Sequence, residues 1–237
     1  MTGDVSRPCA ELLLEIYHRL RGRFGHRNWW PGDTPFEIIV GAILTQNTNW
    51  KNVEKAISNL KRRRALDFEG MLRLPTERLA ELVRPAGYFN QKAARLKITI
   101  EWLSHRTDGD LSRLEQVDTG ELRSELLALK GIGPETADSI LLYAFQRPVF
   151  VIDAYTRRSS ARMGIAGEKS TYGELQDLFE RNLPTDVALF NDFHAQFVEL
   201  GKHHCRKHPR CGGCPLNGIC ARYAEVGADD DRDRNRI

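Results

Sequence analysis

Residues 129–137, LKGIGPETA, combine residue types that suit contact with a phosphate group. Gly131 and Gly133 permit positive φ angles and a close approach by another molecule, and Pro134 suits the first turn of a helix. The backbone N–H groups of such a turn form an anion site. Together with a helix predicted at 119–128, the stretch predicts a helix-hairpin-helix that holds a phosphodiester backbone without reading its sequence. An ordinary tight turn between two helices is the alternative interpretation.

Two acidic residues stand near this hairpin in the sequence. Glu135 follows Pro134, where the helix macrodipole favours an acid in the first turn. Asp153 directly precedes the predicted helix AYTRRSSARM, and aspartate is a favoured N-cap residue worth ~1 kcal/mol. A cap aspartate at the mouth of a cleft can also act on a substrate, so the structural and the chemical roles are compatible.

Four of the five cysteines lie within sixteen residues near the C-terminus, and Cys9 stands alone. In a reducing compartment such clustering indicates metal or iron–sulfur binding rather than disulfides. Four thiolates in one compact loop suit a [4Fe–4S] cluster, and a tetrahedral zinc site is the alternative that the spacing leaves open. Five, two and five residues separate the successive members of this set, which are Cys205, Cys211, Cys214 and Cys220.

The elements that must position these residues are predicted to be helices. Apolar residues recur with a period of 3.6, no useful strand alternation is present, and the predicted fold class is all-α. The stretch PFEIIVGAILTQ is apolar on nearly every side, which predicts a buried central helix that begins at Pro35. Helices are predicted around 12–20 and at 35–46, 51–63, 76–83, 91–105, 119–128, 134–146, 154–163, 171–182 and 187–202.

The bulk composition sets wide limits on function. A chain of 237 residues suits one large domain or two small ones, and its net charge of +3 permits an anionic partner. The apolar runs are shorter than the ~20 residues that span a bilayer, and the N-terminus has no apolar signal core, so a cytosolic protein is expected. The tail 225–237 is poor in apolar residues and is predicted to be disordered.

Taken together, these features resemble the endonuclease III superfamily of helix-hairpin-helix DNA glycosylases. The resemblance rests on LxGIGPxTA, on an aspartate eighteen residues beyond Glu135 in VIDAYTRR, and on the four cysteines, whose first gap is one residue shorter than usual. The stretches NWWPG (28–32), GAILTQNT (41–48) and VRPAGYFNQKAARL (83–96) are similar to the 3-methyladenine DNA glycosylase III and methylpurine DNA glycosylase II group. The resemblance implies a prokaryotic, nucleoid-associated monomer that acts on damaged double-stranded DNA in base excision repair.

This resemblance implies that Asp153 is the catalytic carboxylate, which stabilises an oxocarbenium-like sugar and helps to orient or deprotonate water. Endonuclease III carries a lysine at the position of Glu135, and that lysine forms a Schiff base that permits strand cleavage. Glu135 cannot form one, so hydrolysis is expected to stop at an abasic site. Cationic alkylpurines such as 3-methyladenine and 7-methylguanine leave as neutral bases. One carboxylate can therefore be enough to catalyse their removal.

The resemblance also implies a binding role for several other side chains. Trp29, Trp30 and Trp50 are expected in or near the pocket that receives the everted base, although ordinary packing is the alternative. A phenylalanine is expected at the position of Trp50, so the base preference stays open. Gln46 matches a residue that fills the vacated duplex position, and Tyr88 matches one that wedges into the opposite strand.

For these two residues the alternatives are a buried glutamine satisfied by backbone groups and a surface loop aromatic. Lys92 and Arg95 begin the next helix and are expected to meet phosphates or to form a solvated face. Gly131, Gly133 and Glu135 complete the expected set of DNA contacts.

The predicted architecture is two helical lobes that flank a cleft. A helical barrel at 35–147 ends in the hairpin helix, and residues 1–34 join 148–224 in the lobe that carries the cysteines. Two other functions stay open. One is a glycosylase of the same scaffold for uracil, thymine or oxidised pyrimidines, which would need specific hydrogen-bond partners for a neutral base. The other is a DNA-damage binder without catalytic activity.

Overall fold

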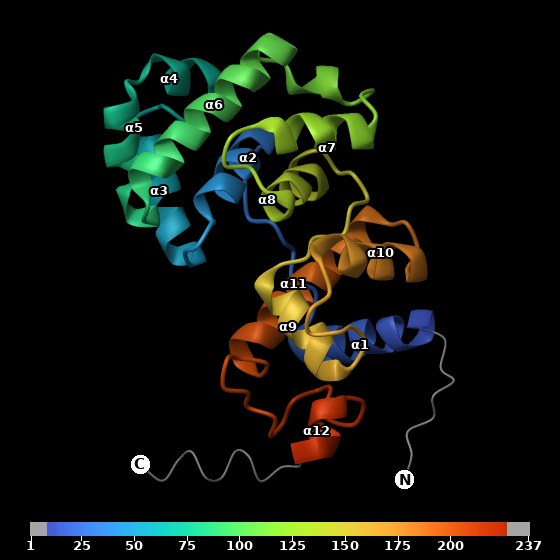
Figure 1. The fold of residues 1–237 in the computed structure, drawn as a ribbon. Helices are drawn as coiled ribbons and strands as arrows, with labels where there is room; N and C mark the ends of the chain where they lie inside the picture. Colours follow the sequence, from blue (N-terminus) through green and yellow to red (C-terminus); the bar gives the residue numbers. More distant parts are fainter. Residues whose placement is uncertain (1–8, 227–237) are drawn as a thin grey trace, which may run out of the picture. The chain divides into compact units, whose positions relative to one another are not determined.

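The structure is a computed structural model of the chain, and it describes residues 9–226 (Figure 1). These residues form helices and connecting segments, with no β-strand among them, which confirms the all-α prediction. The tail predicted to be disordered begins at Glu225, but Glu225 and Val226 are the last residues of a helix, so the prediction is wrong for these two. Residues 227–237 of the predicted tail lie outside the described residues. None of the helices in the described range is long and apolar enough to cross a membrane.

The chain divides into two compact units. We call Trp30–Arg147 the inserted unit, and Met1–Trp29 together with Pro148–Ile237 the terminal unit. The domain boundaries predicted from the sequence stay a prediction. Each unit is described by itself below.

The inserted unit is built around α2 (Pro35–Leu44), which is buried along almost its whole length. Thr34 caps this helix by accepting a hydrogen bond from Glu37 N, and Pro35 occupies its first turn, so the local sequence fixes where it begins. Short 3-10 turns lie at Arg84–Ala86 and Leu111–Leu114. The other α-helices of this unit are α3 (Trp50–Arg62), α4 (Phe68–Arg73), α5 (Thr76–Val83), α6 (Phe89–Thr107), α7 (Thr119–Ala128) and α8 (Pro134–Ser139).

One predicted helix is divided in the structure. The sequence predicts a helix over 134–146, but α8 ends at Ser139 and continues as a wider π-helical turn at Ile140–Ala144. The π turn is fully buried, and it packs against α2 and α8. α4 and the 3-10 turns were not predicted.

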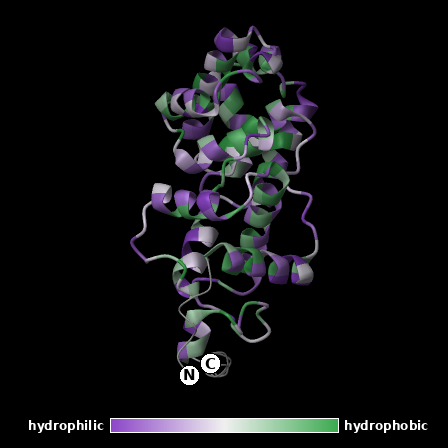
Figure 2. Cartoon of the chain, turned by 90° about the vertical axis from the view of Figure 1, so that its right-hand side faces the viewer, coloured by the Kyte–Doolittle hydropathy of each residue, from purple (hydrophilic) through white to green (hydrophobic). Residues whose placement is uncertain are grey.

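The terminal unit packs an aromatic core between its helices. Phe150 stacks on Phe179 with ring centroids 4.3 Å apart, and Phe193 stacks on Phe197 at 5.0 Å. Its helices carry both hydrophilic and hydrophobic residues, as amphipathic helices do (Figure 2). They are α1 (Cys9–Phe24), α9 (Ala154–Met163), α10 (Tyr172–Asn182), α11 (Val187–His203) and α12 (Ala221–Val226).

A close approach in the terminal unit fixes α9 against α11. A Cβ atom at Gly201 on α11 would lie 2.1 Å from the Tyr155 ring on α9, so only glycine fits there. Tyr155 lies two residues after Asp153. The contact therefore sets the register between the two helices near the predicted catalytic aspartate.

Candidate active site

The predicted helix-hairpin-helix is confirmed by α7, the connecting loop and α8, which pack together in the inserted unit (Figure 1). Asp118 caps α7 by accepting hydrogen bonds from Gly120 N and Glu121 N. Gly131 has φ +90, and a Cβ atom there would lie 2.5 Å from Arg95 Nε. The backbone conformation therefore favours glycine at this position, and any larger residue would displace the Arg95 side chain.

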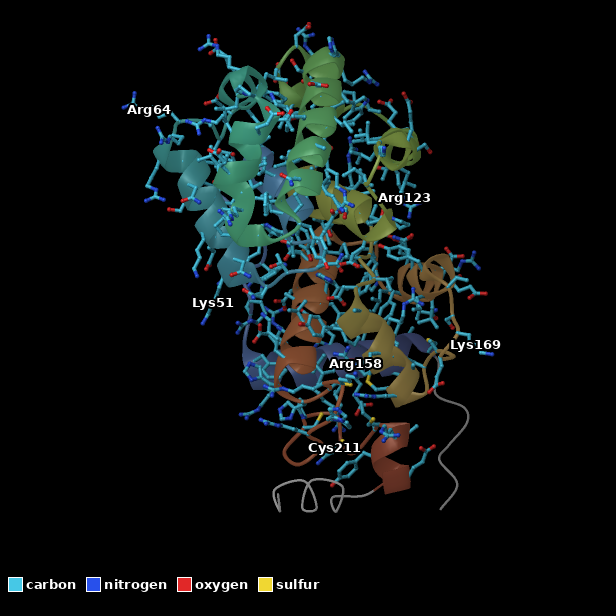
Figure 3. All side chains as sticks on the ribbon, turned by 60° about the vertical axis from the view of Figure 1, so that its left-hand side comes forward. Lys51, Arg64, Arg123, Arg158, Lys169 and Cys211 are labelled. Carbon is cyan, nitrogen blue, oxygen red and sulfur yellow. The ribbon has the colours of Figure 1, made fainter. Side chains whose placement is uncertain are left out.

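A buried ion pair joins the two hairpin helices. Arg123 of α7, labelled in Figure 3, donates from Nε to Asp138 Oδ1 at 2.6 Å and from Nη2 to Asp138 Oδ2 at 3.1 Å. Asp138 is fully buried on α8. This two-point contact holds both helices at one orientation, which a lysine at position 123 could not reproduce.

Gln46 docks onto the hairpin. Its Nε2 donates to the carbonyl of Gly131 at 3.1 Å and to Thr136 Oγ1 at 2.9 Å, and Arg95 donates to its Oε1. The side chain is half-buried and satisfied by protein groups. The role in filling a vacated duplex position stays a prediction, and it would require these bonds to be exchanged for bonds to DNA.

Tyr88 has an unusual backbone for a bulky residue. Its φ of 45 and ψ of 34 lie in the left-handed region, directly after Gly87 with φ 71. Its side chain is 64% exposed, and no other large hydrophobic side chain among residues 9–226 is exposed. A ring held in solvent by a strained backbone is consistent with the predicted wedge, which itself stays a prediction.

The structure contradicts the prediction for Lys92. We expected its ammonium to meet phosphates or solvent, but the residue is 0% exposed. Its Nζ donates to the carbonyl of Leu44 at 2.9 Å and to that of Ala86 at 2.8 Å. Both carbonyls belong to the inserted unit, so the Lys92 ammonium forms hydrogen bonds inside this unit rather than at the protein surface.

An aromatic cluster forms beside α2. The rings of Trp30 and Trp50 meet edge to face with centroids 5.1 Å apart, and Tyr143 of the π turn lies 5.0 Å from Trp30. Gly41 leaves room for them, because a Cβ atom there would lie 3.2 Å from Trp30 Nε1. The sequence analysis missed Tyr143, since nothing in the apolar run ILLYAF distinguishes it from core.

Trp29 lies in the terminal unit, where Lys202 Nζ is 5.6 Å from its ring centroid. The predicted place of Trp29 in a base pocket stays a prediction.

Asp153 caps α9 in the terminal unit, and it is 9% exposed. Its Oδ1 accepts from Thr156 N at 2.7 Å, and His194 Nε2 lies 3.6 Å from its Oδ2. Burial opposes the charged carboxylate, but the nearby His194 imidazole and the hydrogen bond from Thr156 N outweigh it and leave the pKa of Asp153 below its usual value. The carboxylate is therefore ionised at neutral pH.

His194 was missed by the sequence analysis. It projects from α11 and is 4% exposed, in the segment FNDFHAQF. The buried face of this helix carries Phe190, Phe193 and Phe197. An imidazole among these rings was the available signal, because a buried histidine needs a polar partner. Its partner is 41 positions away in the chain, which no local pattern shows.

The four cysteines line one cavity beside α9 and the end of α11. Burial raises the pKa of Cys214 to about 11, and the three other thiols add to this rise, so the four lie near one another. Arg162 of α9 donates to Lys207 O at 2.9 Å, and Arg158, labelled with Cys211 in Figure 3, donates to Cys205 O at 2.8 Å.

Four thiols that line one cavity are a set of sulfur ligands that suits a [4Fe–4S] cluster or a tetrahedral zinc ion.

The hairpin, the buried ionised aspartate and the all-helical fold define a helix-hairpin-helix protein that acts on DNA. The sequence model described as HhH-GPD superfamily base excision DNA repair protein matches residues 40–185. The chain belongs to this superfamily, as its resemblance predicted, and it is a DNA glycosylase of base excision repair.

Individual relatives agree with this assignment. The chain is 46% identical over 212 residues to a Methanocaldococcus jannaschii protein named "Putative DNA repair glycosylase MJ1434", covering 89% of this chain and 96% of that protein. It is 28% identical over 205 residues to endonuclease III of Thermotoga maritima, covering 84% and 89% of the two chains. The solved structure of H. pylori 3-methyladenine DNA glycosylase (MagIII) bound to 1,N6-ethenoadenine is similar at TM-score 0.71 and 31% identity, covering 83% of this chain and 98% of that one.

Proposed function

We propose that this chain is a monofunctional DNA glycosylase that hydrolyses the N-glycosidic bond of alkylated purines in damaged double-stranded DNA. The observation that carries the proposal is Asp153, a buried carboxylate that His194 helps to keep ionised at the start of α9. An anion in that state can stabilise the positive charge that develops on the sugar as the base departs. Thr156 N donates to one carboxylate oxygen, and His194 Nε2 lies 3.6 Å from the other.

One carboxylate suffices when the leaving group is already activated. A purine alkylated at N3 or N7 carries a positive charge and leaves as a neutral base, so it needs little help from an acid. Trp30 and Trp50 offer aromatic faces, which attract a cationic ring by about 0.5–2 kcal/mol each. The resemblance to a 3-methyladenine glycosylase adds support for a purine substrate.

The absence of a lyase step follows from Glu135. A Schiff base needs an amine at this position, and Glu135 in the first turn of α8 has none. The reaction then ends at an abasic site with both strands intact.

The cysteine loop fits this proposal as a structural part. Cys205, Cys211, Cys214 and Cys220 would hold a [4Fe–4S] cluster, which would cross-link the loop and present its exposed basic residues to DNA. Elemental analysis of the purified protein tests this directly. Iron and sulfide are expected, and zinc alone would contradict the cluster.

The test of the function is base release across a panel of duplexes. We expect free 3-methyladenine or 7-methylguanine from methylated DNA, and no adduct when borohydride is added to trap a Schiff base. Release from duplexes with uracil, mismatched thymine or oxidised pyrimidines, but not from methylated DNA, would favour the second glycosylase hypothesis. Specific binding to methylated DNA with no release of any base would favour the hypothesis of a DNA-damage binder without catalytic activity.

A further inference from the structure

Lys92 is among the largest fully buried side chains in the described part of the chain. It lies in the first turn of α6, and its ammonium makes two hydrogen bonds, to Leu44 O at 2.9 Å and to Ala86 O at 2.8 Å. Burial of a charge without a carboxylate partner is costly. Burial and the nearby charge of Arg95 accordingly lower the pKa of Lys92 to about 8.

The position of Leu44 explains why a cation is tolerated there. Leu44 is the last residue of α2, so its carbonyl has no partner within the helix and lies at the negative end of the helix dipole. Ala86 ends the 3-10 turn Arg84–Ala86. Lys92 therefore satisfies the carbonyl ends of two separate elements with one group.

Each of the two carbonyls lies two residues before a residue expected to contact DNA. Leu44 precedes Thr45 and Gln46, the residue docked on the hairpin. Ala86 precedes Gly87 and the exposed, left-handed Tyr88. A single buried ammonium thus connects the base of the Gln46 segment to the base of the Tyr88 segment.

We infer that Lys92 is a positioning residue that fixes the Gln46 and Tyr88 segments relative to each other, so that both enter the DNA duplex at one nucleotide. The inference rests on the proposed DNA glycosylase function, and every residue in it belongs to the inserted unit. Without the ammonium, the two carbonyls would be buried without a donor, and the segments could separate or admit water. Insertion of one residue would then no longer guarantee insertion of the other.

Lys97 provides a matched control on the same helix. Its Nζ also donates to two carbonyls, those of Met71 at 2.9 Å and Leu72 at 2.7 Å, and both belong to α4. Neither is part of a segment expected to contact DNA. Lys92→Met and Lys97→Met therefore each remove one ammonium donor from α6. The two variants differ in which pair of carbonyls loses its donor.

The experiment measures duplex opening without bond cleavage. The full-length protein is mixed with a duplex that carries 2-aminopurine beside a tetrahydrofuran abasic analogue, and the fluorescence rise on binding is titrated at fixed salt. We expect Lys92→Met to reduce the opening equilibrium about tenfold or more and to change duplex affinity far less. Lys97→Met should open the duplex as the wild type does.

A double-mutant cycle keeps the inference testable if Lys92→Met lowers stability. Lys92→Met and Tyr88→Ala should be non-additive in opening, because Lys92 acts through Tyr88, whereas Lys97→Met and Tyr88→Ala should add. If Lys92→Met does not fold, Lys92→Gln takes its place in the cycle.

Equal opening by the wild type and the Lys92 variant, or equal losses for the Lys92 and Lys97 variants, would overturn the inference. Additive effects with Tyr88→Ala would do so too. A wild type that opens this duplex but releases no alkylated purine would count against the proposed substrate and leave the role of Lys92 standing.

Discussion

Asp153 in the terminal unit and Lys92 in the inserted unit are both buried charged side chains, and they are held in opposite ways. In the terminal unit, Asp153 faces His194, a group that can itself carry charge, and a backbone N–H. In the inserted unit, Lys92 donates hydrogen bonds to the carbonyl dipoles of Leu44 and Ala86. The pKa of both groups is lowered, which favours the charged form of the acid and disfavours that of the base.

The difference matches the proposed roles of the two side chains. Asp153 takes part in the reaction through its charge, whereas Lys92 positions two segments through its hydrogen bonds. Asp153 must remain an anion to stabilise a sugar cation, so a partner that supports its charge is useful. Lys92 needs only its N–H donors, and a neutral amine still has two of them. Substitutions at Asp153, His194 and Lys92 can therefore separate the two roles.

The largest effect is expected from Asp153→Asn. Asparagine also caps helices well, so α9 should keep its N-terminus and the melting temperature should change little. Loss of the negative charge should reduce base release by about 10³-fold or more. Single-turnover release and thermal unfolding of the same preparation measure both effects.

Asp153→Ala serves as the comparison for this variant. It should lose the cap as well as the charge, at a cost of about 1 kcal/mol in stability. If the asparagine variant turned over normally, Asp153 would be a structural cap and the proposed mechanism would fail.

A smaller effect is expected from His194→Gln, with a change in pH dependence. Burial of Asp153 remains while the support of His194 is removed, so the pKa of Asp153 should rise. The acidic limb of the base-release profile should therefore move to higher pH, with a loss of about tenfold or more on that limb. His203→Gln is the control, because His203 lies on the same helix and pairs with Glu199 at 3.3 Å. The same pH profile of base release in the wild type, His194→Gln and His203→Gln would mean that His194 does not affect the pKa of Asp153.

The smallest effect concerns Lys92 and stability. The unfolded chain holds the Lys92 proton up to a pKa of 10.5, and the folded chain releases it near a pKa of about 8. Between these values the unfolded state binds more protons, so the contribution of Lys92 to the free energy of unfolding rises with pH. Urea unfolding of wild type and Lys92→Met at about pH 7.5 and about pH 9.5 should show a difference that grows toward high pH in favour of the wild type. A constant difference would show that the Lys92 ammonium keeps its proton throughout.

Elements with local signals were predictable from the sequence. Pro35 and Pro134 mark the starts of α2 and α8, and Asp153 marks that of α9. In contrast, α4 was missed because Gly70 interrupts its short pattern. A Cβ atom there would lie 2.7 Å from Arg64 O, so packing requires a residue that disfavours a helix.

The site was predictable only where residue type and family resemblance coincide. A basic residue in the first turn of a helix normally faces solvent, so the burial of Lys92 could not be inferred without knowing that Leu44 O lies beside it. The pairing of His194 with Asp153 depends on the packing of α11 against α9. Both are long-range consequences of the fold, whereas the hairpin and the cysteine loop lie within short segments.

The π turn at Ile140–Ala144 has a consequence for the aromatic cluster. A π turn holds one more residue than a regular α-helical turn, and each residue of an α-helix rotates the chain by about 100°. Side chains in this segment therefore point in directions that a regular helix would not give them. Tyr143 meets Trp30 from within this turn, so the contact between the two rings depends on the additional residue.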